Sequence, residues 1–178
     1  MMMTMIGNRS DELKKMNDDT NNTPDQLNEK GANFEKGINN FPKNPARAFA
    51  CFKRAAEMGS AEAMKNLGLC HKNAIGTKQD YNAAFAWFEK SAGLGNAAGM
   101  LNVGWCFKSG FGVEKDLKRD VEFFQKSADM NEPTGMLHLG LCLDKGTGIE
   151  RNHERALEWF RKAASMGQMM AQQLLAGK

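Results

Sequence analysis

Apolar residues in this chain follow the three- and four-residue spacing of amphipathic helices, in short stretches separated by polar or glycine-containing segments. The stretches repeat with a period of 36 residues, and no gap is needed to align them. Steps of 36 join Phe52, Phe88, Phe124 and Phe160, and likewise Ala56, Ala92, Ala128 and Ala164. A fixed period in this range is typical of repeat proteins, in which each period forms one structural unit.

The period divides the chain into four units, at 25–60, 61–96, 97–132 and 133–168. Each unit contains two helical stretches, such as AEAMKNLGLCHKN and YNAAFAWFEKSAGL in the second unit. We expect residues 169–178 to form a helix that caps the fourth unit. Residues 1–24 are polar and offer little apolar surface to offset the entropy of ordering, so we expect them to be disordered or weakly helical.

Polar and glycine residues mark the helix ends at the same place in each unit. Side chains that can accept hydrogen bonds at a helix start precede the second stretch: Asn44, Asp80, Asp116 and Asn152. Residues that tolerate the left-handed conformation follow that stretch: Gly59, Gly95, Asn131 and Gly167. The turn between the two stretches carries a further column of this kind: Asn40, Gly76, Gly112 and Gly148. The sequence therefore predicts a helix, a turn and a second helix in every unit.

A helical pair of this size cannot bury its apolar face alone, so neighbouring units must stack on one another. The expected fold is all-α: an α-α superhelix, in the form of a right-handed solenoid of helix-turn-helix repeats. Its core should be continuous along the array, because each unit packs mainly against the units next to it in the sequence.

The composition limits the partners that such a fold could serve. The 178 residues carry 25% charged side chains of both signs and a formal net charge of +3, which does not resemble a nucleic-acid-binding face. No apolar run approaches the roughly 18 to 20 residues that a membrane span needs. The first residues, MMMTMIGNRSDELKK, lack the apolar core of a secretory signal. We expect a cytoplasmic protein that binds neither nucleic acid nor membrane.

Several motifs that recur in phase resemble Sel-1-like repeats, which are relatives of tetratricopeptide repeats. The segments AEAMKNLG, GFGVEKD and ALEWFRKAASMG are similar to the family pattern, and the resemblance extends from Asp25 to Gln168. The first unit has Ala32 in place of a characteristic glycine, so we expect it to be a degenerate cap. The resemblance implies a role in protein-protein interaction, as an adaptor or as a scaffold subunit of a larger assembly.

The cysteines raise the question of metal or redox chemistry. One column holds Phe34, Cys70, Cys106 and Cys142, and another holds Cys51, Trp87, Phe123 and Trp159. Equivalent positions of neighbouring helix pairs lie on the order of 10 Å apart, whereas a disulfide needs Cα atoms within roughly 7 Å. Zinc needs paired ligands, and His71 is the one histidine adjacent to a cysteine. Packing as small apolar side chains is the favoured interpretation; a metal site and a redox site are the alternatives.

Catalytic chemistry has little support in the sequence. The histidines His71, His138 and His153 fall in three different columns, and none has a flanking catalytic motif. We therefore predict that the protein is not an enzyme and uses no cofactor or metal. The alternative function is that of an enzyme or ligand-binding protein of the cysteine-rich Sel-1-like branch, although this chain lacks the second cysteine per unit that the branch carries.

Asp120 does not fit its column, which holds alanine in the other three units. An acid at this position points at or near the core. We expect its carboxylate to reach a basic side chain such as Lys118 or the solvent at the helix edge, because unpaired burial would be costly. A contact with a partner protein is the alternative.

The candidate binding surface is the inner curve of the superhelix, which the resemblance assigns to the first helix of each unit. Four apolar residues fall outside the expected core stripe: Leu101, Trp105, Leu137 and Leu141. A basic column of Lys36, Lys72 and Lys108 borders them. Three polar side chains could bond an extended peptide backbone: Asn66, Asn102 and His138. We expect this surface to bind a protein or peptide partner; the alternative is that curvature or an adjacent repeat buries the apolar residues.

Overall fold

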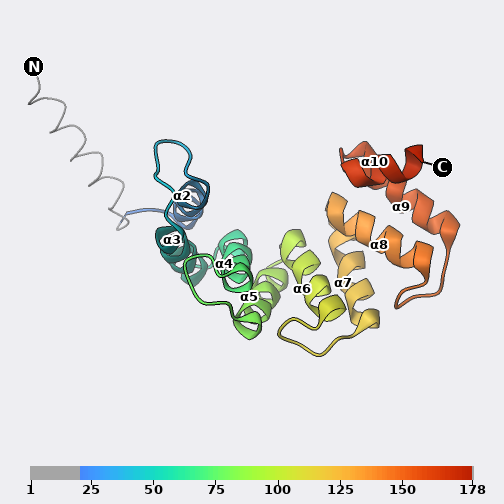
Figure 1. Cartoon of the computed structure of the whole chain (residues 1–178), viewed down its shortest axis with the longest axis horizontal. Coiled ribbons are helices and arrows are strands. Elements are labelled where there is room, and N and C mark those ends of the chain that lie inside the picture. Colours follow the sequence, from blue (N-terminus) through green and yellow to red (C-terminus); the bar gives the residue numbers. More distant parts are fainter. Residues whose placement is uncertain (1–20, 178) are drawn as a thin grey trace, which may run out of the picture.

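The computed structural model describes residues 21–177, in which the helices follow one another along a single curved row (Figure 1). The helices are α2 (Pro24–Lys36), α3 (Pro45–Glu57), α4 (Ala61–Asn73), α5 (Tyr81–Gly93), α6 (Ala97–Ser109), α7 (Leu117–Asp129), α8 (Pro133–Lys145), α9 (His153–Ser165) and α10 (Met169–Ala176). The segment for which we expect disorder or weak helicity, residues 1–24, lies outside the described residues as far as residue 20. Helix α2 begins at Pro24.

The helices alternate between two kinds, which we call A helices (α2, α4, α6, α8 and α10) and B helices (α3, α5, α7 and α9). The predicted caps are confirmed, because Asn44, Asp80, Asp116 and Asn152 each accept a hydrogen bond from a backbone N–H in the first turn of a B helix. The predicted left-handed residues are confirmed as well. The φ angles after the B helices run from 60° to 93°, and those of the column from Asn40 to Gly148 run from 64° to 70°.

The core lies between the A and B helices and consists of three clusters of buried residues along the row. Each B helix buries a phenylalanine that is at most 1% exposed: Phe52, Phe88, Phe124 and Phe160. Each ring lies against a glycine of the preceding A helix, so closely that a Cβ on Gly68 would lie 2.5 Å from Cε1 of Phe88. Because A and B helices pack in this way along the whole row, the predicted all-α superhelix is confirmed.

The junctions between units depend on a second set of close approaches. Gly112 has a φ of 70°, and a Cβ there would lie 2.0 Å from the carbonyl oxygen of Tyr81, at the start of the preceding B helix. Gly76 and Gly148 lie in the same way against Pro45 and Leu117. The turn of each unit is thus seated on the backbone of the unit before it, and a side chain at this glycine would separate the two.

The first unit departs from the period by one residue. Gly31 lies against Phe52 as Gly68 lies against Phe88. The turn between α2 and α3 is one residue longer than the turn between α4 and α5, so each residue of α2 corresponds to the residue 37 positions later and not 36. The additional residue is accommodated by Asn39 and Asn40, both with positive φ. The expectation that Ala32 replaces the characteristic glycine is therefore wrong.

The same offset corrects two more equivalences. The N–H of Asn44 donates to the carbonyl oxygen of Phe34 at 2.8 Å, as the N–H of Asp80 donates to that of His71 at 2.9 Å. Phe34 therefore corresponds to His71 and not to Cys70. By the same shift, Glu35 and not Lys36 corresponds to Lys72.

Candidate functional site

The A helices line the inner curve of the superhelix. Successive A helices contact one another directly (α2 with α4, α4 with α6, α6 with α8), whereas the described B helices make no comparable contact among themselves. We call the surface formed by α4, α6 and α8 on this side the inner groove. Its side chains are half-buried, as expected for a concave face: Asn66, Leu69, Lys72, Leu101, Asn102, Trp105, Lys108, His138 and Leu141.

Trp105 is the largest side chain of the inner groove. Its ring meets the ring of His138 edge-on at 4.6 Å between centroids and that of Phe124 at 6.1 Å. The Lys108 ammonium lies 5.0 Å from the centroid of Trp105 and 5.9 Å from that of Phe124. The indole is thus fixed on one side by the core while the rest of it remains accessible, which is the environment of a binding anchor.

Two of the other three predicted apolar residues share this placement. Leu101 and Leu141 pack against the buried cluster of the C-terminal half and remain partly exposed. Leu137 does not, because it is only 1% exposed and lies inside that cluster, among residues of α7 to α10. The expectation that Leu137 lines the binding surface is therefore wrong.

His138 is a neutral side chain in this environment. Burial, reinforced by the positive charge of Lys108, lowers the pKa of the imidazole to about 4. Its Nδ1 atom is buried and has no hydrogen-bond partner among the described residues. His138 therefore supports Trp105 as a flat uncharged ring.

The amides of Asn66 and Asn102 are partly engaged. The Nδ2 atom of Asn66 donates to Oδ1 of Asn28 at 2.8 Å, and that of Asn102 donates to the carbonyl oxygen of Ala98 at 2.7 Å. The two Oδ1 atoms accept no hydrogen bond from the described residues. The amides are thus oriented by their donors and keep their acceptor atoms available.

Asp120 lies behind the inner groove and is fully buried. Neither carboxylate oxygen has a hydrogen-bond partner among the described residues, so the expectation that Asp120 reaches Lys118 or solvent is wrong. Burial raises the pKa of its carboxyl to about 6, although the positive charge of Lys108 opposes the rise. The third unit thus combines a buried acid with the lysine and tryptophan of the groove.

None of the four cysteines forms a disulfide and all four are buried, which confirms that they pack as core side chains. Burial raises the pKa of the thiols of Cys70, Cys106 and Cys142 to between about 11 and about 12. Such thiols stay protonated and are poor nucleophiles and poor metal ligands. In the part of the chain that the structure describes, no three histidine, cysteine or acidic residues are grouped so that they could hold a metal ion.

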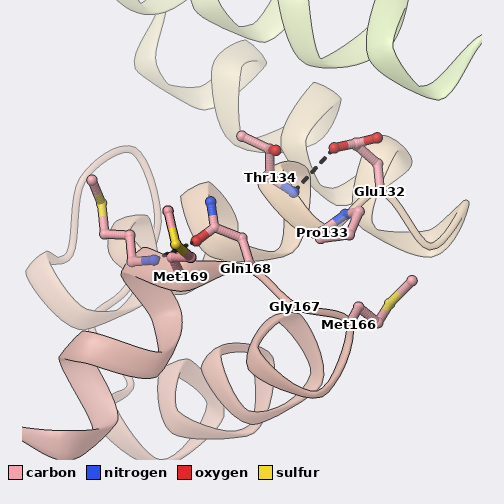
Figure 2. A pocket seen from close by; sticks show the side chains of 8 residues that line it. Glu132, Pro133, Thr134, Met166, Gly167, Gln168 and Met169 are labelled. Atoms are coloured by element: carbon pink, nitrogen blue, oxygen red, sulfur yellow. Dashed lines mark hydrogen bonds between the residues drawn. The ribbon is translucent and has the colours of Figure 1, made fainter.

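A shallow pocket of about 500 Å³ lies outside the inner groove, where the start of α8 approaches the turn between α9 and α10. Figure 2 shows Glu132 bonded to the backbone of Thr134 on one side and Gln168 beside Met169 on the other. Both polar side chains serve as helix caps, so the pocket presents mainly exposed thioethers from Met166, Met169 and Met170.

The exposed Met166 belongs to a row that our sequence analysis missed. The residue just before the left-handed turn is large, apolar and 45 to 57% exposed in every unit: Met58, Leu94, Met130 and Met166. The same 36-residue step that located the core would have found it, because each member precedes a glycine or asparagine of the turn column. These residues border the junctions between units and do not belong to the inner groove.

Comparison with known families identifies the repeat. A family model for the Sel1 repeat matches residues 31–60, 61–96, 97–132 and 133–168. The chain belongs to the Sel1 repeat family. Sel1 repeat proteins generally act as scaffolds for protein interaction. None of the curated proteins matches the chain.

Solved Sel1 repeat structures resemble the chain closely. A Sel1 repeat protein from Oxalobacter formigenes is 29% identical with a TM-score of 0.82, covering 86% of this chain and 61% of its own. The protective antigen c5321 of uropathogenic Escherichia coli, which displays an SLR fold, is 32% identical with a TM-score of 0.78, covering 85% and 32%. This chain therefore spans less than two thirds of either relative.

A cysteine-rich structure has the same fold. Cysteine rich protein B (hcpB) of Helicobacter pylori is 23% identical with a TM-score of 0.58, over 71% of this chain and 96% of its own. At this identity the likeness concerns the fold alone.

Within the described residues of our chain, no helix is both long and apolar enough to span a membrane.

Proposed function

We propose that this Sel1 repeat chain is an adaptor or scaffold module that holds a segment of a partner protein in the inner groove. The observation that carries the proposal is the placement of Trp105, a half-buried indole on the inner curve, backed by Phe124 and flanked by Leu101 and Leu141. Aromatic side chains in such partly enclosed positions contribute a disproportionate share of binding energy, because they bury a large rigid surface.

The placement of the cysteines gives the cysteine-rich alternative no support. It depends on cysteines paired within each unit, whereas the four cysteines of this chain form no disulfide and are buried in the core. The thiol groups therefore contribute packing. The groove remains the surface with the best combination of an apolar anchor, oriented amides and charged rim.

The test compares tryptophans on opposite sides of the array. Trp159 is a matched control for Trp105, because it is also half-buried and also has a lysine ammonium, that of Lys162, over its ring at 4.4 Å. It lies on a B helix. We expect Trp105→Ala to weaken capture of partner proteins from a cell lysate at least tenfold, and Trp159→Ala to leave the set of captured proteins unchanged.

Thermal melting of both variants completes the test. Equal folding of the two variants, together with selective loss of capture for Trp105→Ala, supports groove binding. Loss of capture in the Trp159 variant alone would instead place the binding surface on the B helices and reject the proposal.

A further inference from the structure

We infer that the inner groove selects an extended partner segment with two acidic residues three positions apart and a basic residue three positions beyond them. The two acids lie on Lys72 and Lys108, and the basic residue lies on Glu35. This inference rests on the proposed function and specifies the chemistry of the partner.

The inference starts from a charged lane along the groove edge, which consists of Glu35, Lys72, Lys108 and Asp144. The last three are equivalent by the 36-residue step, and the one-residue offset of the first unit makes Glu35 their counterpart. The lane therefore has the charge order negative, positive, positive, negative. With Lys36 in place of Glu35, as the period alone suggested, the first three positions would all be basic.

Electrostatic contacts with the next A helix support the lane. Burial is the main cause of the raised pKa of the cysteine thiols, and each of the first three lane residues adds an effect on the cysteine of the next A helix. Glu35 raises the pKa of Cys70, whereas Lys72 and Lys108 lower those of Cys106 and Cys142. Glu35 is thus placed relative to the second unit as Lys72 is placed relative to the third unit and Lys108 relative to the fourth.

The spacing of the lane fits an extended chain. Adjacent A helices touch, and packed helices lie about 8 to 10 Å apart. An extended chain in the polyproline II conformation advances about 3.1 Å per residue with three residues per turn, so three residues cover about 9 Å and every third side chain points the same way. Every third side chain of such a segment can therefore meet one lane residue after another.

The polar side chains favour an extended partner over a helical one. A helix with charges seven residues apart also advances about 10 Å, but its backbone groups are bonded internally. The amides of Asn66 and Asn102 recur at the same pitch, with donors held by Asn28 and Ala98 and with Oδ1 atoms that accept nothing from the described residues. An extended backbone supplies N–H groups for these acceptors.

The apolar side chains of the groove complete the pattern. Leu69, Trp105 and Leu141 occupy equivalent positions in the second, third and fourth units, and all three are half-buried. They form a second lane beside the charged one. A segment that fits both lanes has an apolar residue next to each charged one.

Asp144 and Asp120 modulate the far end of the charged lane. The carboxylate of Asp144 lies 2.5 Å from Nδ1 of His153, so one of its oxygen atoms is engaged by that ring. The buried carboxylate of Asp120 attracts Lys108 from below. Lys72 has Ala84 at the position equivalent to Asp120 and is not opposed in this way. We therefore expect Lys72 to bind the partner more strongly than Lys108.

The test uses two labelled synthetic peptides and fluorescence anisotropy with the full chain. The first peptide is Lys-Leu-Thr-Glu-Leu-Thr-Glu-Leu-Thr-Lys, and the second exchanges every Lys and Glu. We expect the wild type to bind the first at least tenfold more tightly. The variant Lys72→Glu/Lys108→Glu should reverse this preference, because it inverts the centre of the lane.

A matched control carries the same charge change on the outer helices. Lys90 and Lys126 are also 36 residues apart and lie on B helices over the rings of Trp87 and Phe123. The variant Lys90→Glu/Lys126→Glu should retain the wild-type preference. If the groove variant fails to fold, Lys72→Gln/Lys108→Gln replaces it, and this variant should reduce the preference to about threefold or less.

Three outcomes overturn the inference. In the first, the wild type binds both peptides equally or binds neither. In the second, the preference is unchanged in the Lys72 and Lys108 variants. In the third, a stapled helical peptide with acids seven residues apart binds more tightly than the extended one. If these occur while Trp105→Ala still abolishes partner capture, the groove binds a partner of other chemistry. If Trp105→Ala also has no effect, the proposed function itself fails.

Discussion

The two central junctions of the array differ from the two at its ends. At the centre, a buried serine of the B helix faces a glycine of the next A helix: Ser91 faces Gly99, and Ser127 faces Gly135. At the ends, the same positions pair Ala55 with Ala63 and Ala163 with Ala171. The two kinds of pair have similar total volume. Packing at the junctions therefore limits the combined volume of the two side chains and not the identity of either one.

The third unit also differs from the second unit within the inner groove and behind it. The third unit holds Asp120 at an alanine position and Trp105 at a leucine position, whereas the second unit has Ala84 and Leu69. An unpaired buried acid costs folding free energy, and natural proteins retain such groups mainly where function requires them. The two units therefore differ at the proposed binding surface and directly behind it. The predictions below test this difference and run from the largest expected effect to the smallest.

The largest effect should come from a feature that all junctions share. Gly112→Ala should destabilise the chain by more than about 3 kcal/mol, since its Cβ would lie 2.0 Å from the Tyr81 carbonyl oxygen at a φ of 70°. Urea denaturation monitored by circular dichroism measures the loss.

Gly110 in the same turn is the control for Gly112. Its φ is 75°, but its nearest neighbour would be 3.7 Å away, so Gly110→Ala should cost only about 1 kcal/mol. Equal losses for the two variants would show that backbone conformation dominates and that the junction contact is unimportant.

The second effect is the stabilisation expected when the third unit is made like the second. The folded pKa of Asp120 is about 6 against an ordinary value of 3.8, so the native state holds this proton more tightly than the unfolded chain. Ionisation therefore opposes folding above about pH 6. As an upper limit, the rise of the pKa from 3.8 to about 6 corresponds to roughly 3 kcal/mol.

Asp120→Ala should accordingly raise stability most at pH 7 to 8, and its advantage should shrink as the pH falls from about 6 to 4. His138 also titrates in the lower part of this range, but it does so in both proteins. The difference between variant and wild type, measured by urea denaturation at several pH values, isolates Asp120. A variant that is less stable at pH 8 would mean that the carboxylate makes a favourable contact in the native state.

Much of this structure could be predicted from the 36-residue period. The helix caps, the left-handed turns and the burial of the cysteines each followed from a residue type that recurs in one column, because one local requirement is repeated in every unit. The pairing of Ser91 with Gly99 is also visible in the sequence, but only when two columns are compared with each other.

The errors arose where the period does not describe the local environment. The period aligns Lys36 with Lys72, but this alignment is wrong. An additional residue in the first turn, next to Asn39, shifts the register of α2 without changing the later units. Leu137 occupies the same column as the half-buried Leu101, yet it is enclosed in the cluster of α7 to α10 near the end of the array. The register of α2 and the burial of Leu137 both depend on neighbouring residues, which an alignment of the repeats does not reveal.

The third prediction tests the volume rule at the central junction. Gly99→Ala should cost about 1 to 3 kcal/mol, because the new Cβ would lie 2.5 Å from Oγ of Ser91. Ser91→Ala alone should cost about 1 kcal/mol through loss of the 2.7 Å hydrogen bond to the Ala61 carbonyl oxygen. The double variant reproduces an end junction and should lie within about 1 kcal/mol of the wild type.

Gly93→Ala serves as the control for this cycle, because a Cβ at that helical position meets nothing within 4 Å. It should be neutral or slightly stabilising, as expected for alanine in a helix. Additive losses in the double variant would show that Ser91 and Gly99 are not coupled.

The smallest change in stability should come from Trp105→Leu, which gives the third unit the residue found in the second and fourth. The indole is half-buried and its ring contacts are to Phe124 and His138, so leucine can retain the covered part of the contact while losing the exposed part. We expect a loss of about 1 kcal/mol or less in urea denaturation, with an unchanged dependence on urea concentration. Binding of a partner segment should nevertheless fall severalfold, since the exposed part of the indole is the part that a partner covers. A loss of stability above about 3 kcal/mol would instead mark Trp105 as a core residue, because only a fully enclosed indole contributes that much to folding.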